Sequence, residues 1–199
     1  MNRFEGKSAL VTGGSSGIGL AAARAFATEG ARVIITGRDA TALEAAKVLL
    51  GGNALALRSD AGDPGAAKSL AAVIAGHGIT LDALFINAGI GRFAAFPDVD
   101  EAFWDEVFNT NVKGAYFQIQ ALLPALNRGA SIVINGSINA HIGMPNSSVY
   151  AASKAAIVQI RQMVPCRETS LTHAPETTPG TAQTAHVRRT PAESRSCAG

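Results

Sequence analysis

Short apolar runs alternate with longer amphipathic segments through most of the chain. A continuous run of about four to eight apolar residues is typical of a strand that is buried on both faces of a parallel sheet. The runs predict strands at residues 8–11, 32–36, 54–59, 81–86 and 131–135.

The segments between these runs carry apolar residues at the three-to-four residue period of an amphipathic helix. Pro64 suits the first turn of a helix, because proline lacks the amide hydrogen that a first turn leaves unpaired. Gly114 and Pro124 interrupt the pattern of one long segment. We predict helices at residues 20–28, 42–50 and 64–75, a mainly helical stretch over 100–126, and a helix that begins near residue 149.

Strands and helices that alternate in this way build a parallel sheet with helices on both faces. The predicted fold class is therefore α/β, a Rossmann-type doubly wound parallel sheet. Residues 1–164 form one predicted domain that is large enough to bury a core. From residue 165 the chain is rich in Thr, Pro, Ala, Ser and Arg, and its only large aliphatic residues are Leu171 and Val187. We therefore expect residues 165–199 to be disordered.

Composition narrows the functional classes. The 199 residues carry a formal charge of only +2, with basic residues spread along the chain, so we expect no nucleic-acid partner. No apolar run reaches the roughly 18 residues of a membrane span, and residues 1–5 lack the apolar core of a signal peptide, so we expect a cytoplasmic protein without a membrane partner. The two cysteines, Cys166 and Cys197, provide neither a disulfide framework nor a metal-ligand cluster, and no metal is expected.

A glycine-rich stretch, Thr12–Gly19, connects the first predicted strand to the first helix. Glycines let the backbone approach a phosphate, and the helix N-terminus supplies unpaired N–H donors, so this turn predicts a site for a dinucleotide pyrophosphate. Its spacing is Gly-x-x-x-Gly-x-Gly, which differs from the general Gly-x-Gly-x-x-Gly fingerprint. The alternative is a tight strand-to-helix turn without a ligand. The candidate cofactor residues here are Gly13, Ser15, Ser16, Gly17, Ile18 and Gly19.

Arg38 and Asp39 follow the second predicted strand, where a dinucleotide fold reads the adenosine ribose. An acidic group favours a free 2′-hydroxyl, whereas a guanidinium favours a 2′-phosphate. We favour Arg38 as the residue that contacts the 2′ position of the ribose, and hence NADP as the cofactor, with NAD as the alternative. A solvated loop pair that reads nothing is the other interpretation.

Two further polar turns follow predicted strands. Asp60 comes after the third strand, beside the expected adenine pocket, and could instead cap a helix or turn. Asn87, Ala88 and Gly89 follow the fourth strand at the expected topological switch point of the sheet. We predict that these three residues form the floor of the cofactor crevice.

Tyr150 and Lys154 stand at positions i and i+4 of a predicted helix, so their side chains are neighbours. A nearby ammonium favours the phenolate form of a tyrosine, which makes such a pair a candidate acid–base group. A pair of this kind is common on surfaces, but Ser137 at the end of the fifth strand and the upstream nucleotide turn strengthen the catalytic interpretation. A buried helical asparagine such as Asn111 usually bonds a neighbouring carbonyl.

These motifs together resemble the classical short-chain dehydrogenase/reductase family over roughly residues 5 to 160. The resemblance implies hydride transfer between a nicotinamide and a carbonyl or secondary alcohol, without a metal, and a homo-oligomeric assembly. It implies that Tyr150 is the acid or base and that Ser137 polarises the substrate oxygen. It also implies that Tyr150 and Lys154 bind the cofactor, with Lys154 on the nicotinamide ribose, and that Asn111 positions a relay water. The motifs are Thr12–Gly19, Asn87–Gly89, Asn111, Ser137 and Tyr150–Lys154.

The resemblance stops near Pro165. We recognise no sixth strand, no Pro-Gly turn, no substrate lid and no last strand, so we expect the fifth strand to be a bare sheet edge. The alternative function is therefore an inactive or unstable nucleotide-binding remnant. The substrate, a small carbonyl or alcohol compound, is not identified by the sequence, and we interpret Phe93 and Phe96 as packing residues rather than as an apolar pocket rim.

Overall fold

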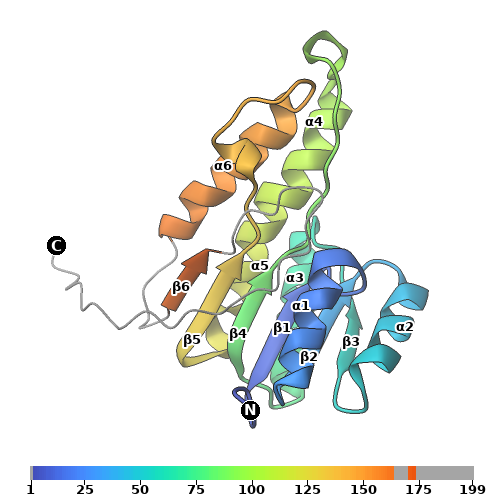
Figure 1. Cartoon of the computed structure of the whole chain (residues 1–199), viewed down its shortest axis with the longest axis vertical. Coiled ribbons are helices and arrows are strands. Elements are labelled where there is room, and N and C mark those ends of the chain that lie inside the picture. The colour runs from blue at the N-terminus through green and yellow to red at the C-terminus, as the bar shows by residue number, and fades with distance from the viewer. Residues whose placement is uncertain (1, 164–169, 174–199) are drawn as a thin grey trace, which may run out of the picture.

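A parallel sheet of six strands forms the centre of the molecule (Figure 1). The computed structural model describes residues 2–163 and 170–173. The strand order is β3-β2-β1-β4-β5-β6, so the order of connection reverses between β1 and β4 and creates a topological switch point there. The doubly wound parallel sheet predicted from the sequence is confirmed. The strands are β1 (Ser8–Thr12), β2 (Arg32–Gly37), β3 (Leu55–Arg58), β4 (Leu81–Ile86), β5 (Leu126–Ile134) and β6 (Ser170–His173).

Helices cover both faces of this sheet (Figure 1). Asp39, Asp63 and Asp100 each stand at a helix N-cap and accept a hydrogen bond from a first-turn amide, which explains where those helices begin. The helices are α1 (Gly17–Thr28), α2 (Ala40–Leu50), α3 (Pro64–Gly76), α4 (Glu101–Phe108), α5 (Ala115–Leu122) and α6 (Ser148–Met163), with short 3₁₀ turns η1 (Phe96–Asp98), η3 (Leu123–Ala125) and η4 (Ile138–Ala140).

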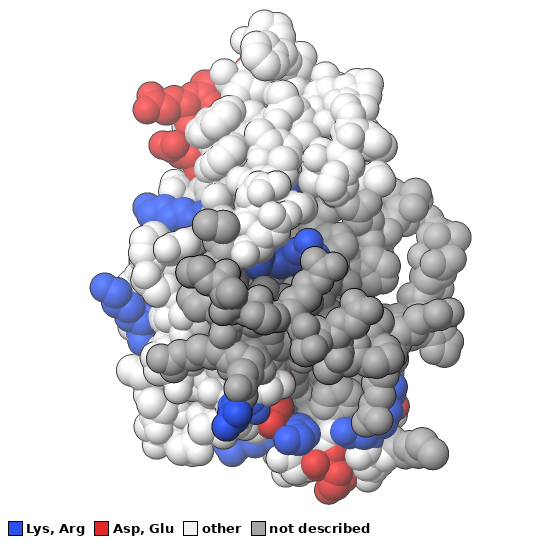
Figure 2. All heavy atoms as spheres, turned by 90° about the vertical axis from the view of Figure 1, so that its left-hand side faces the viewer, with Lys and Arg blue, Asp and Glu red and all other residues white. Residues whose placement is uncertain are grey.

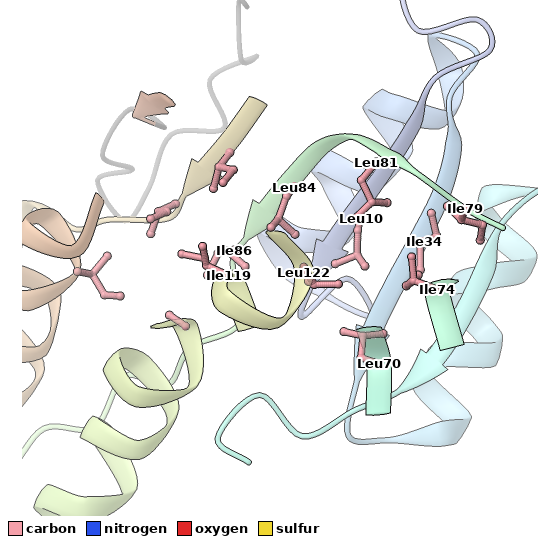
Figure 3. Close-up of a cluster of buried hydrophobic side chains, with 14 residues drawn as sticks. Leu10, Ile34, Leu70, Ile74, Ile79, Leu81, Leu84, Ile86, Ile119 and Leu122 are labelled. Atoms are coloured by element: carbon pink, nitrogen blue, oxygen red, sulfur yellow. The ribbon is translucent and has the colours of Figure 1, made fainter. Parts of the chain in front are cut away.

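The alternation of side chains along β1 separates two core clusters. Leu10 and its neighbours on one face pack against α3, α5 and α6, and Figure 3 shows Leu10 close to Ile34, Leu84 and Leu122. Ala9 and Val11 point to the other face and pack against α1 and α2. Because both faces are buried, the central strands can be apolar at every position, which is the pattern that the sequence shows.

The long helical stretch predicted over residues 100–126 contains a π-helical segment, η2 (Asn109–Gly114), between α4 and α5. Gly114 explains part of the predicted interruption, because a Cβ there would lie 1.9 Å from the Ala61 carbonyl oxygen. The glycine therefore lets this helix approach the turn after β3. Wide helical turns of this kind are frequent at functional sites, and η2 carries Asn111.

The edge of the sheet beyond β5 differs from the sequence-based expectation. β6 pairs in parallel with β5, from Ser131 opposite Ser170 to Ile134 opposite His173. The prediction that β5 is a bare edge was therefore wrong. The segment was missed because Leu171 is its only aliphatic residue. The rest of the segment predicted to be disordered, residues 165–169 and 174–199, lies outside the described residues.

None of the helices in the described ranges combines the length and the apolar character that crossing a bilayer requires. Figure 2 shows one face of the molecule, on which the lysine and arginine side chains of the described residues stand in scattered positions rather than in a continuous stripe.

Candidate active site

A cleft of about 390 Å³ lies at the carboxyl ends of β1, β2, β3, β4 and β5. It includes the topological switch point between β1 and β4, where open parallel sheets bind ligands. Most of the predicted cofactor residues line it, namely Gly13, Ser15, Ser16, Gly17, Ile18, Arg38, Asp60, Asn87, Ala88 and Gly89. The remaining lining residues are Thr36, Gly37, Ser59, Ala61, Ile90, Thr110 and Asn135.

The glycine-rich turn gives the cleft a backbone surface. Gly13 and Gly17 have positive φ angles of 64° and 52°, which glycine adopts without steric cost. Ser16 is the N-cap residue of α1, yet its side chain makes no capping hydrogen bond. The first amides of α1 are thus left without a side-chain acceptor, as an anion site at a helix N-terminus requires.

Gly19 has a different place from the other glycines of the turn, because it does not line the cleft. A Cβ at this position would lie 2.1 Å from the Gly13 carbonyl oxygen and 2.6 Å from Asn87 Nδ2. Gly19 therefore allows α1 to pack closely against the turn, and this packing fixes the shape of the cleft although Gly19 does not line it.

A network of hydrogen bonds ties the turn to the floor of the cleft. The Thr12 hydroxyl accepts from the backbone amides of Asn87 at 2.9 Å and Ala88 at 3.0 Å. Asn87 Nδ2 donates to the carbonyl oxygens of Thr12 and Gly13. Asn135 Nδ2 completes the network by donating to Asn87 Oδ1 at 3.0 Å. The ends of β1, β4 and β5 are therefore held in register with each other.

The two charges after β2 have different surroundings. The Asp39 carboxylate caps α2, since its Oδ1 accepts from the amides of Thr41 at 2.8 Å and Ala42 at 3.0 Å. Arg38 instead lines the cleft. Arg58, at the end of β3, donates from Nε to the Arg38 carbonyl oxygen at 3.1 Å, which places its guanidinium against the main chain of Arg38.

The turn after β3 supplies polar groups of two kinds. Asp60 Oδ1 accepts from the Gly62 amide at 2.9 Å, so this carboxylate caps its own turn while it lines the cleft. Ser59 lines the cleft too, and its hydroxyl is buried and has no hydrogen-bond partner among the described residues. An orphaned buried hydroxyl is costly unless a ligand or water satisfies it.

Lys154 and Tyr150 lie next to each other on α6, as their spacing predicts. The Lys154 ammonium lies 5.8 Å from the centre of the Tyr150 ring. Lys154 is only 7% exposed, and its Nζ donates to the Asn135 carbonyl oxygen at 2.9 Å. Burial lowers the pKa of this ammonium to about 8. A Cβ on Gly89 would lie 3.7 Å from Lys154 Nζ, so the lysine head group borders the cleft at Gly89.

Asn111 is buried in η2, and its side-chain amide is fully engaged. Its Oδ1 accepts from the Ile90 amide at 2.8 Å, and its Nδ2 donates to the Ile90 carbonyl oxygen at 2.9 Å and to the Ser153 hydroxyl at 3.1 Å. The Ser153 hydroxyl in turn donates to the Tyr150 carbonyl oxygen. Asn111 therefore links the exit of β4 to the helix that carries the tyrosine and lysine.

Ser137 follows β5 and stands at the N-cap of η4, where its hydroxyl accepts from the Asn139 amide at 3.2 Å. The η4 turn packs against α6, so Ser137 lies close to the helix on which Tyr150 is found.

Sequence reasoning missed several residues of the site. Asn135 could have been found, because it is a polar residue at the end of a predicted strand, as Asn87 is. Ser153 and Ser59 could not be found from the sequence, because no local pattern distinguishes them from other serines and only contacts with distant residues bury them. Phe93 was interpreted as packing, and the structure places its ring 5.5 Å from the Tyr150 ring, with 59% of the side chain exposed.

A doubly wound parallel sheet with a glycine-rich first turn and a polar cleft at its switch point defines a dinucleotide-binding α/β protein. Residues 7–192 match the sequence profile described as short chain dehydrogenase. The chain therefore belongs to the short-chain dehydrogenase family, as its motifs predict.

Individual relatives agree with this assignment. The chain is 40% identical over 159 residues to oxidoreductase asL5 of Sarocladium schorii, an alignment that covers 79% of this chain and 64% of the relative. Among solved structures, a short chain dehydrogenase from Burkholderia cenocepacia in complex with NADP has a TM-score of 0.79 at 35% identity, over 86% of this chain and 74% of that one. The Pseudomonas aeruginosa RhlG/NADP active-site complex has a TM-score of 0.76 at 34% identity, over 81% and 67%. The chain thus spans slightly less than two thirds of the length of the curated relative.

Proposed function

We propose that the chain is an NADP-preferring oxidoreductase that transfers a hydride between the nicotinamide and a carbonyl or secondary alcohol. The observation that carries the proposal is the position of Lys154. Its ammonium lies beside the Tyr150 ring, bonds the Asn135 carbonyl and borders the cofactor floor at Gly89. A buried cation in this position can supply positive charge beside the phenol and can also bind a nucleotide in the cleft.

The residues present fit a dinucleotide. The turn from Gly13 to Gly17 offers backbone amides for the pyrophosphate, and the orphaned Ser59 hydroxyl and the Asp60 carboxylate stand where the adenine end would lie. Lys154 has ammonium hydrogens beyond the one used on Asn135, and these would hold the nicotinamide ribose. The bound cofactor would supply or accept the hydride.

The preference for NADP rests on Arg38 and Arg58. In the described part of the chain neither guanidinium has an ion-pair partner. Asp39, which could neutralise Arg38, is engaged as the cap of α2. An uncompensated guanidinium on Arg38 at the cleft, with Arg58 bonded to the Arg38 main chain, favours a dianionic 2′-phosphate over a hydroxyl. The NADP named in the two solved relatives supports the same preference.

Four residues of the chain would each have a separate role in transferring the proton. Tyr150 would donate a proton to the carbonyl oxygen in reduction and accept it in oxidation. Ser137 would hydrogen-bond the same oxygen and stabilise its developing charge. Lys154 would hold the ribose and supply positive charge beside the phenol at pH values below about 8. Because the Asn111 amide is occupied, a relay water would bind through the Asn111 main-chain carbonyl.

The test is a titration of the purified chain with NADPH and NADH, followed by nicotinamide fluorescence and thermal unfolding. A ligand that binds only the folded state adds roughly 2.7 kcal/mol at a hundredfold excess over its dissociation constant. We expect a larger shift with NADPH than with NADH, and NADPH oxidation when carbonyl compounds are added.

Tyr150→Phe is the matched control for the chemical step. It should bind NADPH as the wild type does and lose about a thousandfold in turnover, because general acid–base catalysis contributes roughly that much. A chain that binds NADPH but turns over no carbonyl compound would support the alternative of a nucleotide-binding remnant. A chain that binds neither nucleotide would contradict both.

A further inference from the structure

Phe93 is placed against the side chain proposed to do the chemistry. It lies on the loop after β4, and its ring contacts the Tyr150 ring at a centroid distance of 5.5 Å and an angle of 56°. More than half of the side chain, 59%, remains exposed. Phe93 thus packs one part of its ring on Tyr150 and offers the rest to whatever binds beside the phenol.

The loop that carries Phe93 is fixed at several points. Ile90 exchanges two hydrogen bonds with Asn111. The Arg92 guanidinium pairs with Glu106 and stacks 4.5 Å from the centre of the Phe103 ring.

On the other side of Phe93, the Ala94 amide donates to the Asn146 carbonyl oxygen at 2.9 Å. Because residues on both sides of Phe93 are anchored, the backbone of the folded loop holds Phe93 at a position from which its ring reaches Tyr150.

The surroundings of Phe93 leave room for its ring beside Tyr150. A Cβ on Gly91 would lie 3.5 Å from the Phe93 ring and 3.9 Å from Tyr150 Cε2, which are ordinary contact distances, so residue 91 borders both rings. Ile142 and Met144, on the loop joined to Ala94 through Asn146, are each nearly half exposed as well. The two loops that flank the proposed chemistry therefore both carry exposed apolar side chains.

We infer that Phe93 forms an apolar wall of the substrate site, and that the substrate is a carbonyl compound with an aryl or similarly flat apolar substituent on its carbonyl carbon. This inference rests on the proposed function, which fixes the carbonyl oxygen at the Tyr150 hydroxyl. The substituent must then lie beside the neighbouring ring. An aryl group gains aromatic contact there, whereas a polyhydroxylated substituent would lose water from its hydroxyl groups without a partner.

The experiment compares three ketones that share the reacting group, namely acetophenone, acetone and dihydroxyacetone. Their dissociation constants are measured by calorimetry on the full chain saturated with NADP⁺, a complex in which no hydride can be transferred. We expect acetophenone to bind the wild type at least about tenfold more tightly than either aliphatic ketone, the order of an aromatic contact plus its buried area.

Phe93→Ala should weaken acetophenone by about tenfold and leave acetone and NADP⁺ binding unchanged, while Phe93→Leu should recover part of the loss. Phe96→Ala is the matched control, because Phe96 follows the same loop at the start of η1 but is 81% exposed, and it should change nothing.

Three results would overturn the inference. These are equal loss for all ketones in Phe93→Ala, a preference of the wild type for dihydroxyacetone, and NADP⁺ binding without any ketone binding. A preference for dihydroxyacetone would leave the proposed function standing, whereas failure to bind NADP⁺ would remove both.

Discussion

The two ends of the cleft are built from different parts of the polypeptide. At the proposed nucleotide end, formed by residues 13–18 and the ends of β2 and β3, the path of the backbone depends on glycines. At the proposed catalytic end, which borders the cleft at Asn135, the buried side chains of Asn111 and Lys154 hydrogen-bond to neighbouring groups, and Lys154 lies beside the Tyr150 ring. One end therefore depends on the absence of side chains and the other on their identity.

This difference predicts how each end responds to change. At the proposed nucleotide end, a single added Cβ can destroy the shape, while under the proposed function the exposed charges of Arg38 and Arg58 would set the preference between nucleotides. At the catalytic end, Lys154 is held in a buried position that disfavours its charge. A buried charged group of this kind lowers the free energy of unfolding, and such destabilising groups are common at functional sites.

The largest expected effect on stability is that of Gly19→Ala. The new Cβ would lie 2.1 Å from the Gly13 carbonyl oxygen, and backbone cannot move aside as a flexible side chain can. We expect a loss of about 3 kcal/mol in the free energy of unfolding, at the upper end of overpacking effects, together with loss of nucleotide binding. Urea unfolding followed by circular dichroism measures it.

Gly52→Ala is the control for this change, since no atom lies within 4 Å of its added Cβ and its φ is not positive. It should be close to neutral. A Gly19→Ala variant as stable as Gly52→Ala would show that α1 does not pack against the turn as described.

The second effect concerns the buried ammonium at the other end of the cleft. Burial lowers the pKa of Lys154 to about 8 in the folded chain, against 10.5 for a solvent-exposed lysine. Between these pH values the unfolded chain binds more protons, so stability rises with pH in this window. Relative to Lys154→Met, the wild type should gain about 2.5 kcal/mol between pH 7 and pH 10.

The measurement is the difference in unfolding free energy between wild type and Lys154→Met at several pH values, without nucleotide. Groups common to both proteins cancel in that difference. A difference that stays constant with pH would mean that Lys154 is not buried as a charged group. Lys113→Met, a change of the same type on η2, should show no such dependence if burial of Lys154 is the cause.

The fold was predictable because strand and helix periods are local properties of the sequence. The switch-point residues Asn87–Gly89 followed from the same reasoning, since the ends of parallel strands meet at one edge. The bond from Lys154 to Asn135, the orphaned hydroxyl of Ser59 and the contact of Phe93 with Tyr150 were not predictable in this way. Each depends on residues that are distant in the chain, so the local pattern of apolar and polar residues contains no sign of it.

The third effect is one of specificity at the nucleotide end. Arg38→Gln should weaken NADPH by about ten- to a hundredfold, or roughly 1.5 to 3 kcal/mol, because a charge-assisted bond to the 2′-phosphate is lost. NADH should bind as before. Arg58→Gln should produce a smaller change in the same direction, because Arg58 does not line the cleft.

Fluorescence titration with both nucleotides measures these ratios, and Arg32→Gln, at the opposite end of β2, controls for removal of one positive charge. Equal weakening of NADPH and NADH by Arg38→Gln would show that Arg38 acts on the shape of the cleft and not on the phosphate.

The smallest effect separates Asp39 from Arg38. Asp39→Ala removes the cap of α2 and should cost about 1 kcal/mol of stability, the usual value for a lost N-cap. Asp39→Asn keeps a capping side chain and removes only the charge, so it should retain most of that stability. Because the carboxylate lies beside the proposed phosphate site, both variants should bind NADPH at least as well as the wild type. If Asp39 instead reads a free ribose hydroxyl, both variants would lose NADH affinity while keeping NADPH. Comparing NADH titrations of the two variants with their urea unfolding therefore decides whether the acid at this end of the cleft supports the helix or selects the nucleotide.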